Sequence, residues 1–439
     1  MRLASFATRC MDTLFTSLYV NPYLGLIAYI ITAPLAEWHF HSLVKRHIKR
    51  RSMQKHAVHS STSDAAEALK AWELQLLEST PQQIDALFRG WFFGSGEPRH
   101  GNVVEMFCWM IHNLDVAECT AEQRCAVDAL IGRIEGVRGC PFPPGREPNL
   151  KVMSYTLDPW AVRHKPLIAY LLLGMARSLL ASVLTRYGYE KQRAGRLEFY
   201  CRPAPDPCRR PRPPVPPPIV LMHGVLGILP YAMLLRLLAL KHTGAILVPL
   251  FPHASISLEQ LCDAMKHEDD PHDGPELVAA LRTMIARHSP PATPPKAAFI
   301  AHSLGSGMLA PLMRTAPELI AAAAFIDPIC FLLHDGAVLK NFMYSAPPLV
   351  DAAKGVARAA SDLDLQRLVH SQKDVFHWCQ RHIVASEPTM QENFRRCFWW
   401  TQHWLHPSEI GCDAIVHLSG QDSIVDASKI LHYLQSYQR

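Results

Sequence analysis

One short run constrains the fold more than any other part of this chain. Residues 298–301 are apolar, His302 and Ser303 follow, and after further small residues an apolar pattern resumes at Met308. A strand that turns sharply into a helix can hold its central residue in a strained conformation, with the hydroxyl exposed above a sheet and the next N–H free to donate. Ala301 occupies a position in this turn that requires a small residue. We therefore predict that Ser303 is a nucleophile.

A second apolar run, Pro218–Met222, lies upstream and ends in His223-Gly224 and a glycine-bearing loop. The oxyanion formed in acyl transfer needs two fixed donors, usually the N–H after the nucleophile and an N–H in the loop after an earlier strand. Leu304 and Val225 occupy these positions. The order and separation of the two motifs resemble the α/β-hydrolase superfamily, which implies an α/β-hydrolase fold with a mostly parallel central sheet.

Apolar strands alternate with helical segments through this half of the chain, which is typical of a parallel sheet covered on both faces. An early strand is expected at 196–201. The remaining expected strands are 219–222, 245–251, 297–301 and 322–326, and the expected helices are 231–241, 276–286 and 307–316. Ser303 then lies at the carboxyl end of its strand, where such sheets bind ligands.

After this alternation, residues 330–410 are predicted to form helices rich in aromatic residues. The family resemblance implies a helical cap at this point. The aromatic residues are Phe376, Trp378, Phe394, Phe398, Trp399, Trp400 and Trp404. Large aromatic faces suit an apolar acyl substrate. The alternative is ordinary packing of the insertion's own core.

Two carboxylates are candidates for the acid that orients a catalytic histidine. Asp422 follows a strand expected at 413–420, and it resembles the acid of the superfamily in its position just past a strand end. Asp327 is the alternative acid, because some lipases of this fold place the acid one strand earlier; it can equally have a structural role.

The catalytic base is not identified in the sequence. In the superfamily it lies in a loop after one more strand, whereas here a helix expected at 427–438 is followed directly by Arg439, so the final strand is expected to be missing. His432 is a candidate base but lies early, within that helix; His223 and His302 are expected to be structural. Three explanations stay open: the natural polypeptide is longer, the base comes from elsewhere, or the protein keeps the fold without catalytic activity.

The N-terminal region predicts contact with a membrane. Residues 14–36 carry no charge and are long enough to span a bilayer, although Asn21-Pro22 and Pro34 interrupt them. A spanning helix, an in-plane anchor and a soluble packing helix are the alternatives. The basic block 45–51 would keep the main domain on the cytosolic side and contact anionic headgroups; a solvated helix face would explain it equally.

Residues 57–158 follow a helical pattern, with helices expected at 65–77 and at 103–114, just after Asn102. Short strings at 88–94, 101–105 and 156–160 are similar to the N-terminal region of uncharacterised, membrane-associated fungal α/β-hydrolases.

Residues 166–184 are strongly apolar. Arg177 near their middle argues against a second span and favours a helix lying against the core or the membrane surface. Residues 203–218 are rich in proline, and we expect an extended loop or a polyproline docking site there.

The predicted divisions are an anchor with its basic segment at 1–56, a helical region at 57–190 and an α/β-hydrolase domain at 191–439.

Composition narrows the function classes. The net charge of +5 over 439 residues does not indicate the strongly basic surface of a nucleic-acid-binding protein. The 12 cysteines are scattered without a C-x-x-C pair, so neither a zinc site nor a disulfide framework is predicted, and buried free thiols are expected. No metal or organic cofactor is implied.

Together these features predict a membrane-associated serine hydrolase that cleaves esters of lipid-like acyl substrates. A catalytically inactive binding or scaffold protein of the same fold is one alternative, and an acyltransferase that uses the same site is another.

Overall fold

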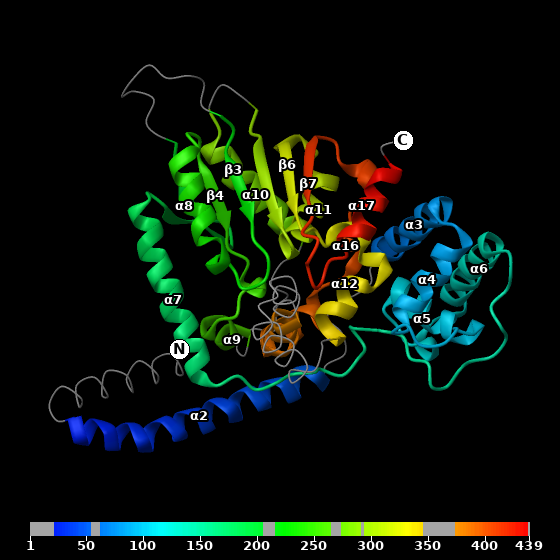
Figure 1. Ribbon diagram of the computed structural model, residues 1–439, viewed down its shortest axis with the longest axis horizontal. Helices are drawn as coiled ribbons and strands as arrows, with labels where there is room; N and C mark the ends of the chain where they lie inside the picture. The colour runs from blue at the N-terminus through cyan, green and yellow to red at the C-terminus, as the bar shows by residue number, and fades with distance from the viewer. Residues whose placement is uncertain are drawn as a thin grey trace, which may run out of the picture.

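The computed structural model describes residues 22–53, 62–204, 216–264, 274–290, 294–345 and 374–437. In this part of the chain seven strands form one sheet (Figure 1). They are β1 (Glu190–Ala194), β2 (Leu197–Arg202), β3 (Ile219–Met222), β4 (Ile246–Pro249), β5 (Ala297–His302), β6 (Ile320–Ile326) and β7 (Asp413–His417). Their order is β1-β2-β4-β3-β5-β6-β7. The sheet is parallel from β4 to β7 and antiparallel at β1 and β2. The predicted α/β-hydrolase fold is confirmed.

The strands divide their side chains between two cores, because successive residues of a strand point to opposite faces. Leu221, Ile246 and Val248 pack into a small core with residues of α7 (Leu167–Arg186) and α8 (Ala232–Lys241). Val220 and Leu247, from the same strands, lie in the larger core, which also contains residues of α10 (Gly274–His288) and α11 (Leu304–Thr315). Both faces are therefore covered, which explains why these strands are apolar throughout.

Strand β1 was not predicted, because Glu190–Ala194 has neither apolar alternation nor β-branched residues. It pairs antiparallel with β2, from Glu190 opposite Cys201 to Ala194 opposite Leu197. Gly195, with a φ of 60°, allows the tight turn between them. The pairing partner, rather than the local sequence, makes this segment a strand.

The helical region before the sheet lies beside it and shares its larger core (Figure 1). It contains α3 (Thr62–Glu78), α4 (Pro81–Trp91), α5 (His100–His112) and α6 (Ala121–Arg138). One indole from each side donates a hydrogen bond across the junction. Trp91 Nε1 of the helical region donates to the carbonyl oxygen of His334 at 2.7 Å, and Trp400 Nε1 of the insertion donates to that of Met110 at 3.0 Å. The predicted division at residue 190 stays a prediction.

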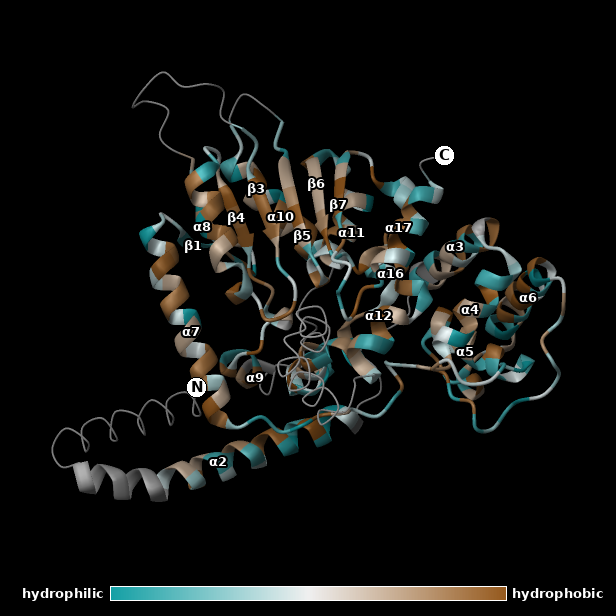
Figure 2. Cartoon of the chain, in the orientation of Figure 1, coloured by the Kyte–Doolittle hydropathy of each residue, from teal (hydrophilic) through white to brown (hydrophobic). Residues whose placement is uncertain are grey.

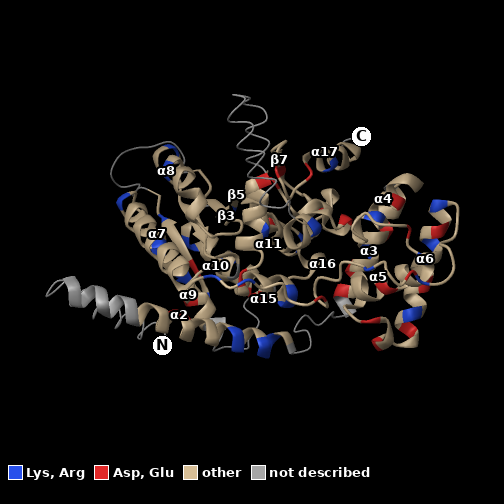
Figure 3. Cartoon of the chain, turned by 60° about the horizontal axis from the view of Figure 1, so that its bottom comes forward, with Lys and Arg blue, Asp and Glu red and all other residues tan. Residues whose placement is uncertain are grey.

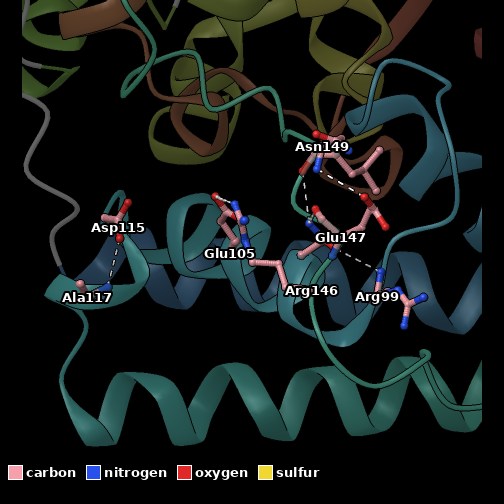
Figure 4. A network of polar contacts seen from close by, with 9 residues as sticks. Arg99, Glu105, Asp115, Ala117, Arg146, Glu147 and Asn149 are labelled. Carbon is pink, nitrogen blue, oxygen red and sulfur yellow. Dashed lines mark hydrogen bonds and ion pairs between the residues drawn. The ribbon is translucent and has the colours of Figure 1, made fainter.

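Helix α5 begins at His100, before the predicted start, and Asn102 is its third residue rather than its N-cap. The buried Asn102 side chain accepts the N–H of the N-cap residue Arg99 at 3.3 Å and that of Glu147 at 2.9 Å, and it donates to the carbonyl of Leu150 at 3.2 Å. An ion pair between Arg146 and Glu105 fastens the same loop to α5 (Figure 4). Asn102 therefore holds a long connection against the helix.

Helix α2 (Pro22–Met53) runs along the lower edge of the molecule in Figure 1. Residues 1–21, and with them the first part of the predicted anchor, lie outside the described residues. Pro22 begins the helix, where its missing N–H costs nothing, and the helix continues through Pro34. The predicted interruption at Pro34 is therefore absent from the structure.

The basic block of α2 has two sides. Lys45, Arg46, Lys49 and Arg50 are exposed, whereas His47 and Arg51 are buried against Glu392. Figure 3 colours the Lys and Arg positions along α2 blue. His47 Nε2 lies 3.0 Å from one carboxylate oxygen of Glu392, and Arg51 Nε donates to the other at 2.5 Å. The interpretation of the whole block as a solvated face was therefore incomplete, since part of it joins α2 to the insertion.

The insertion after β6 consists of short helices, several with π-helical turns. They are η6 (Cys330–Asp335), α12 (Ala337–Leu339), η7 (Lys340–Tyr344), η8 (Gln380–Val384), α15 (Pro388–Glu392), η9 (Asn393–Cys397) and α16 (Trp400–His403). Trp399, Trp400 and Trp404 are buried in the shared core, whereas Phe376 is exposed. Ordinary core packing thus accounts for the tryptophans. Helix α17 (Ala427–Ser436) follows β7, which is an edge strand of the described sheet.

Helix α7 is apolar on two sides (Figure 2). Leu180 and Leu184 pack on the sheet, while the outer side exposes Ile168, Leu172, Met175, Leu179 and Val183. Arg177 turns inward and donates to the carbonyl of Ile256 at 2.5 Å. By length and composition α7 is the one described helix that could cross a membrane, but its inner side packs on the hydrolase core.

Candidate active site

Ser303 lies in the sharp turn between β5 and α11, with φ 52° and ψ −121°. Residues other than glycine seldom adopt a positive φ, and the resulting backbone strain persists only where the surrounding structure holds the residue in place. Three contacts do so here. The N–H of Ser303 donates to the carbonyl of Ile326 on β6 at 3.0 Å, and its own carbonyl accepts the N–H and the hydroxyl of Ser306 at 2.9 and 2.6 Å.

Two glycines let the neighbouring backbone approach the turn closely. A β-carbon at Gly305 would stand 2.2 Å from the carbonyl oxygen of Met222, at the end of β3. A β-carbon at Gly224 would stand 3.1 Å from the β-carbon of Ser303. The loop after β3 therefore lies directly against the serine, as the sequence motifs predict.

The backbone N–H groups of Val225 and Leu304 are the two predicted oxyanion donors. Both residues line the same cavity as Ser303. Among the described residues neither N–H has a hydrogen-bond acceptor. Leu304 is also the first residue of α11, where unpaired amides and the helix dipole favour negative charge.

The cavity has a volume of about 450 Å³ and is mainly apolar. Residues of α7, of the loop after β3 and of the insertion line it; among them are Leu173, Leu333, Phe342, Phe394 and Phe398. Its described lining contains one lysine, Lys165, and one carboxyl side chain, Asp422. Such a lining suits a hydrocarbon chain with a polar group at one end.

His302 is the one histidine in the described lining of the cavity. The N–H of Gly224 donates to the hydroxyl oxygen of Tyr231 at 2.8 Å, and this oxygen lies 2.5 Å from His302 Nδ1. Burial raises the pKa of Tyr231 to about 12, so the phenol is protonated at neutral pH. The phenol can donate to Nδ1 or accept from it, and in either case it engages Nδ1.

Burial also lowers the pKa of His302, although the carboxylates of Asp327 and Asp422 oppose this effect. Because Tyr231 engages Nδ1 and also accepts the N–H of Gly224, His302 joins the turn to the loop after β3. The structural role expected for His302 stays a prediction.

The other histidines considered do not supply a base in the cavity. His223 is fully buried and its pKa is lowered to about 4 by burial; its Nε2 accepts the N–H of Phe251 at 3.2 Å. His432 is exposed on α17 and is not among the residues that line the cavity.

Asp422 lines the cavity. Its Oδ1 accepts the N–H groups of Ile424 and Val425 at 2.7 and 2.6 Å, which fixes the carboxylate within the loop between β7 and α17. Its Oδ2 accepts no hydrogen bond from a described residue. An acid with one fixed and one available oxygen can orient an imidazole.

Asp327 is arranged differently. It is buried, has a φ of 43°, and both carboxylate oxygens are occupied by Ser419: Oδ1 accepts the N–H at 2.6 Å and Oδ2 accepts the hydroxyl at 2.7 Å. These contacts join the ends of β6 and β7. Of the two predicted acids, Asp422 has the geometry that leaves an oxygen for a partner.

Tyr231 and Lys165 are among the lining residues that were not singled out from the sequence. Tyr231 follows a proline at the start of a helix, and nothing in that pattern indicates that its hydroxyl contacts both the loop after β3 and His302. Lys165 lies in a short basic string before α7, far from the hydrolase motifs in sequence. Only the folded chain brings either residue to Ser303's cavity.

No family model matches the sequence, and no curated protein is similar to it. Among solved structures the chain is similar to a bacterial membrane phospholipase A described as a virulence factor, with 16% identity, 61% of this chain and 83% of that chain covered, and a TM-score of 0.35. It is also similar to a 2-hydroxy-6-oxo-6-phenylhexa-2,4-dienoate hydrolase from Rhodococcus, with 18% identity, 56% and 87% covered, and a TM-score of 0.33.

An acylaminoacyl peptidase from Pyrococcus horikoshii matches at 12% identity, over 57% of this chain and 36% of that chain, with a TM-score of 0.33. The fold follows from the strand order and from the turn at Ser303.

Proposed function

We propose that the protein is a membrane-associated serine hydrolase that cleaves esters of lipid-like acyl substrates. The strained turn at Ser303, beside two unoccupied backbone donors and an apolar cavity, is the observation that supports this proposal most strongly. Ser303 Oγ attacks the ester carbonyl, and the N–H groups of Val225 and Leu304 stabilise the negative charge that develops on its oxygen. Asp422 orients the histidine that takes the proton of Ser303, a residue that is not identified in this chain.

The apolar cavity supports an acyl substrate rather than a polar one. Removing a hydrocarbon chain from water contributes about 0.8 kcal/mol per buried methylene, so the lining can hold a chain without any specific polar contact. The carbonyl then needs polar partners only at Ser303, Val225 and Leu304. Transfer of the acyl group to an acceptor other than water uses the same groups.

The outer side of α7 supports association with a membrane. Its exposed residues recur at positions 168, 172, 175, 179 and 183, which places them on one side of the helix. The exposed cations of α2 lie on the same molecule and favour an anionic, cytosol-facing bilayer. An in-plane helix of this kind would bring the cavity to the lipid surface.

A catalytically inactive binding protein is the second candidate function. The observation in its favour is that His302 is the one histidine in the described cavity lining and that its Nδ1 is already occupied. A serine without a base to take its proton loses several orders of magnitude in rate.

A fluorophosphonate probe distinguishes the two candidates, because it labels only a serine that is activated as a nucleophile. The hydrolase is expected to be labelled, and the label is expected to disappear in Ser303→Ala. Ser182→Ala, which removes an exposed hydroxyl of α7, is the control and should label like the wild type. An unlabelled, folded wild-type protein would favour the binding protein.

A further inference from the structure

The cavity has an enclosed part and an open part. Phe394 and Phe398 line it from the insertion and are buried, whereas Phe376 and Ile383 line it while 60% and 46% exposed. An ester with its carbonyl at Ser303 has two arms, the acyl chain and the alcohol part. The enclosed aromatic part suits the acyl chain, which leaves the open part for the alcohol.

One side of a short helical stretch in the insertion forms the open part. Phe376, Cys379, Gln380 and Ile383 recur at helical spacing, and all of them line the cavity. Gln380, the first residue of the π-helical turn η8, is the one amide side chain in the described lining. An alcohol part that extends from Ser303 towards solvent therefore meets this amide.

A hydrogen bond fixes the Gln380 amide beside the candidate acid. Its Oε1 accepts the hydroxyl of Ser423 at 2.6 Å, and Ser423 directly follows Asp422 in the chain. Asp422 lines the same cavity. Gln380 thus joins the open part of the cavity to the loop that carries the acid.

The nitrogen of the same amide is available to a ligand. Gln380 Nε2 has no acceptor among the described residues, although an amide nitrogen can donate twice. It also keeps accessible surface, since it does not belong to the fully buried polar atoms that lack a partner. A fixed donor that opens into an apolar cavity favours a ligand with an acceptor at that place.

The charges of the lining favour a neutral acceptor over an anion. Its lysine and its carboxyl side chain, Lys165 and Asp422, have opposite formal charges. Lys165 Nζ already donates to the carbonyl of His382 at 2.7 Å and to the hydroxyl of Ser386 at 3.0 Å. Burial lowers the pKa of Lys165 to about 8, and the charge of Glu387 opposes this effect, so a carboxylate already lies near the cation. The described lining therefore has no surplus positive charge for an anionic headgroup.

We infer that Gln380 recognises the alcohol part of the ester and that this part carries a free hydroxyl group, as in a monoacylglycerol. This inference rests on the proposed function, because the ester at Ser303 divides the substrate into its two arms. Gln380 Nε2 donates to the hydroxyl oxygen, while the proton of that hydroxyl stays free to bond with water. Gln380 determines specificity and takes no part in bond making or breaking.

Binding to full-length protein carrying Ser303→Ala tests the inference without turnover. The two probes are monodecanoylglycerol and propyl decanoate, which share the acyl chain and the carbon skeleton of the alcohol and differ in its hydroxyl groups. Equilibrium dialysis below their solubility limits, with a label in the acyl chain, measures bound and free ester. We expect monodecanoylglycerol to bind at least about fivefold more tightly, as one net hydrogen bond implies.

Gln380→Met, made in the same background, removes the amide and keeps the length of the side chain. We expect this variant to lose the preference, while its affinity for propyl decanoate stays equal or rises. Gln402→Met, on an exposed residue of α16, is the matched control and should keep the preference.

Ser423→Ala separates recognition from a structural role, because it breaks the same hydrogen bond and leaves the Gln380 amide in place. Both Gln380→Met and Ser423→Ala should lower the melting temperature, but the Ser423→Ala protein should keep most of the preference. An equal loss of preference in the two variants would overturn the inference, since the link between η8 and the loop would then explain it.

Equal binding of the two esters by the Ser303→Ala protein would also overturn the inference, as would a preference that persists in Gln380→Met. Tighter binding of the phosphate ester of monodecanoylglycerol than of monodecanoylglycerol itself would reject the neutral alcohol. Failure of fluorophosphonate labelling together with a preference that depends on Gln380 would reject the hydrolase and keep a site for a hydroxylated lipid. Labelling of the wild type without any preference would keep the hydrolase and reject this inference.

Discussion

Gly305 lies directly against the carbonyl oxygen of Met222, which a β-carbon at Gly305 would approach to 2.2 Å. This contact sets the distance between α11 and β3 and therefore between the serine and the loop after β3. We expect Gly305→Ala to destabilise the protein by about 3 kcal/mol or more, because backbone on both sides must move. Thermal unfolding would measure this loss.

Gly132→Ala is the control for that substitution. Gly132 lies inside α6, and nothing stands within 4 Å of the position its β-carbon would take. Alanine should stabilise the helix there by about 0.5–1 kcal/mol. If the two alanine variants had the same melting temperature, the close approach at Gly305 would be refuted.

Asp422 and Asp327 are expected to respond in opposite ways to substitution. Asp422→Asn keeps an oxygen for the N–H groups of Ile424 and Val425 but removes the charge, so the melting temperature should change little. The rate of fluorophosphonate labelling should fall at least about tenfold, because a neutral amide supports a charged imidazole poorly.

Asp327→Ala should instead lower the free energy of unfolding by about 1–3 kcal/mol, since the N–H of Ser419 loses its acceptor. We expect labelling of the folded fraction to continue at close to the wild-type rate. A variant pair with the reverse behaviour would make Asp327 the acid.

The buried carboxylate of Glu392 is expected to make a pH-dependent contribution to the free energy of unfolding. Burial opposes ionisation of this carboxylate, but the hydrogen bond from His47 and the charges of His47 and Arg51 lower its pKa below the ordinary value. The contribution is therefore complete above the unfolded pKa, near 4.3, and is lost as the pH falls through the lower folded pKa.

Glu392→Gln leaves Arg51 buried without its partner and should cost about 3 kcal/mol at neutral pH. The difference in melting temperature from wild type should shrink as the pH falls below the unfolded value. Glu318→Gln, which breaks the exposed pair with Arg282, should leave the melting temperature unchanged at every pH. A pH-independent difference at Glu392 would exclude this ion pair as its cause.

The outer side of α7 is expected to bind anionic vesicles. Leu172→Glu combined with Leu179→Glu places charge on residues that are 56% and 67% exposed, so the fold should tolerate both changes. Vesicle affinity, measured by sedimentation, should fall at least about tenfold because apolar burial is replaced by repulsion. Leu77→Glu, on α3 and 83% exposed, should bind like the wild type. Equal loss in the double variant and in Leu77→Glu would exclude a specific membrane side.

Local patterns predicted much of the hydrolase half. The apolar runs that end at Met222 and at His302 are strands β3 and β5, because residues buried on both faces of a sheet leave a continuous apolar signal. Polar β1 escaped prediction because its conformation depends on β2. Pro34 was expected to break a helix that continues through it.

Only those residues of the candidate site that lie within a local sequence motif could be predicted. Ser303 and the loop at Val225 belong to strand–turn junctions that can be recognised locally. The choice between Asp422 and Asp327 depends on what Ser419 does with its N–H and hydroxyl, which is a tertiary contact. The approach of Lys165 to His382, 217 residues apart, leaves no local signal at all.

The indoles that donate across the junction with the N-terminal helices also define what can be made in isolation. Trp91 and Trp400 each place a ring from one half of the chain against a carbonyl of the other. Recombinant fragments that start at β1 would present that broad aromatic seam to solvent and are expected to aggregate. The smallest soluble unit of this protein should therefore begin before α3.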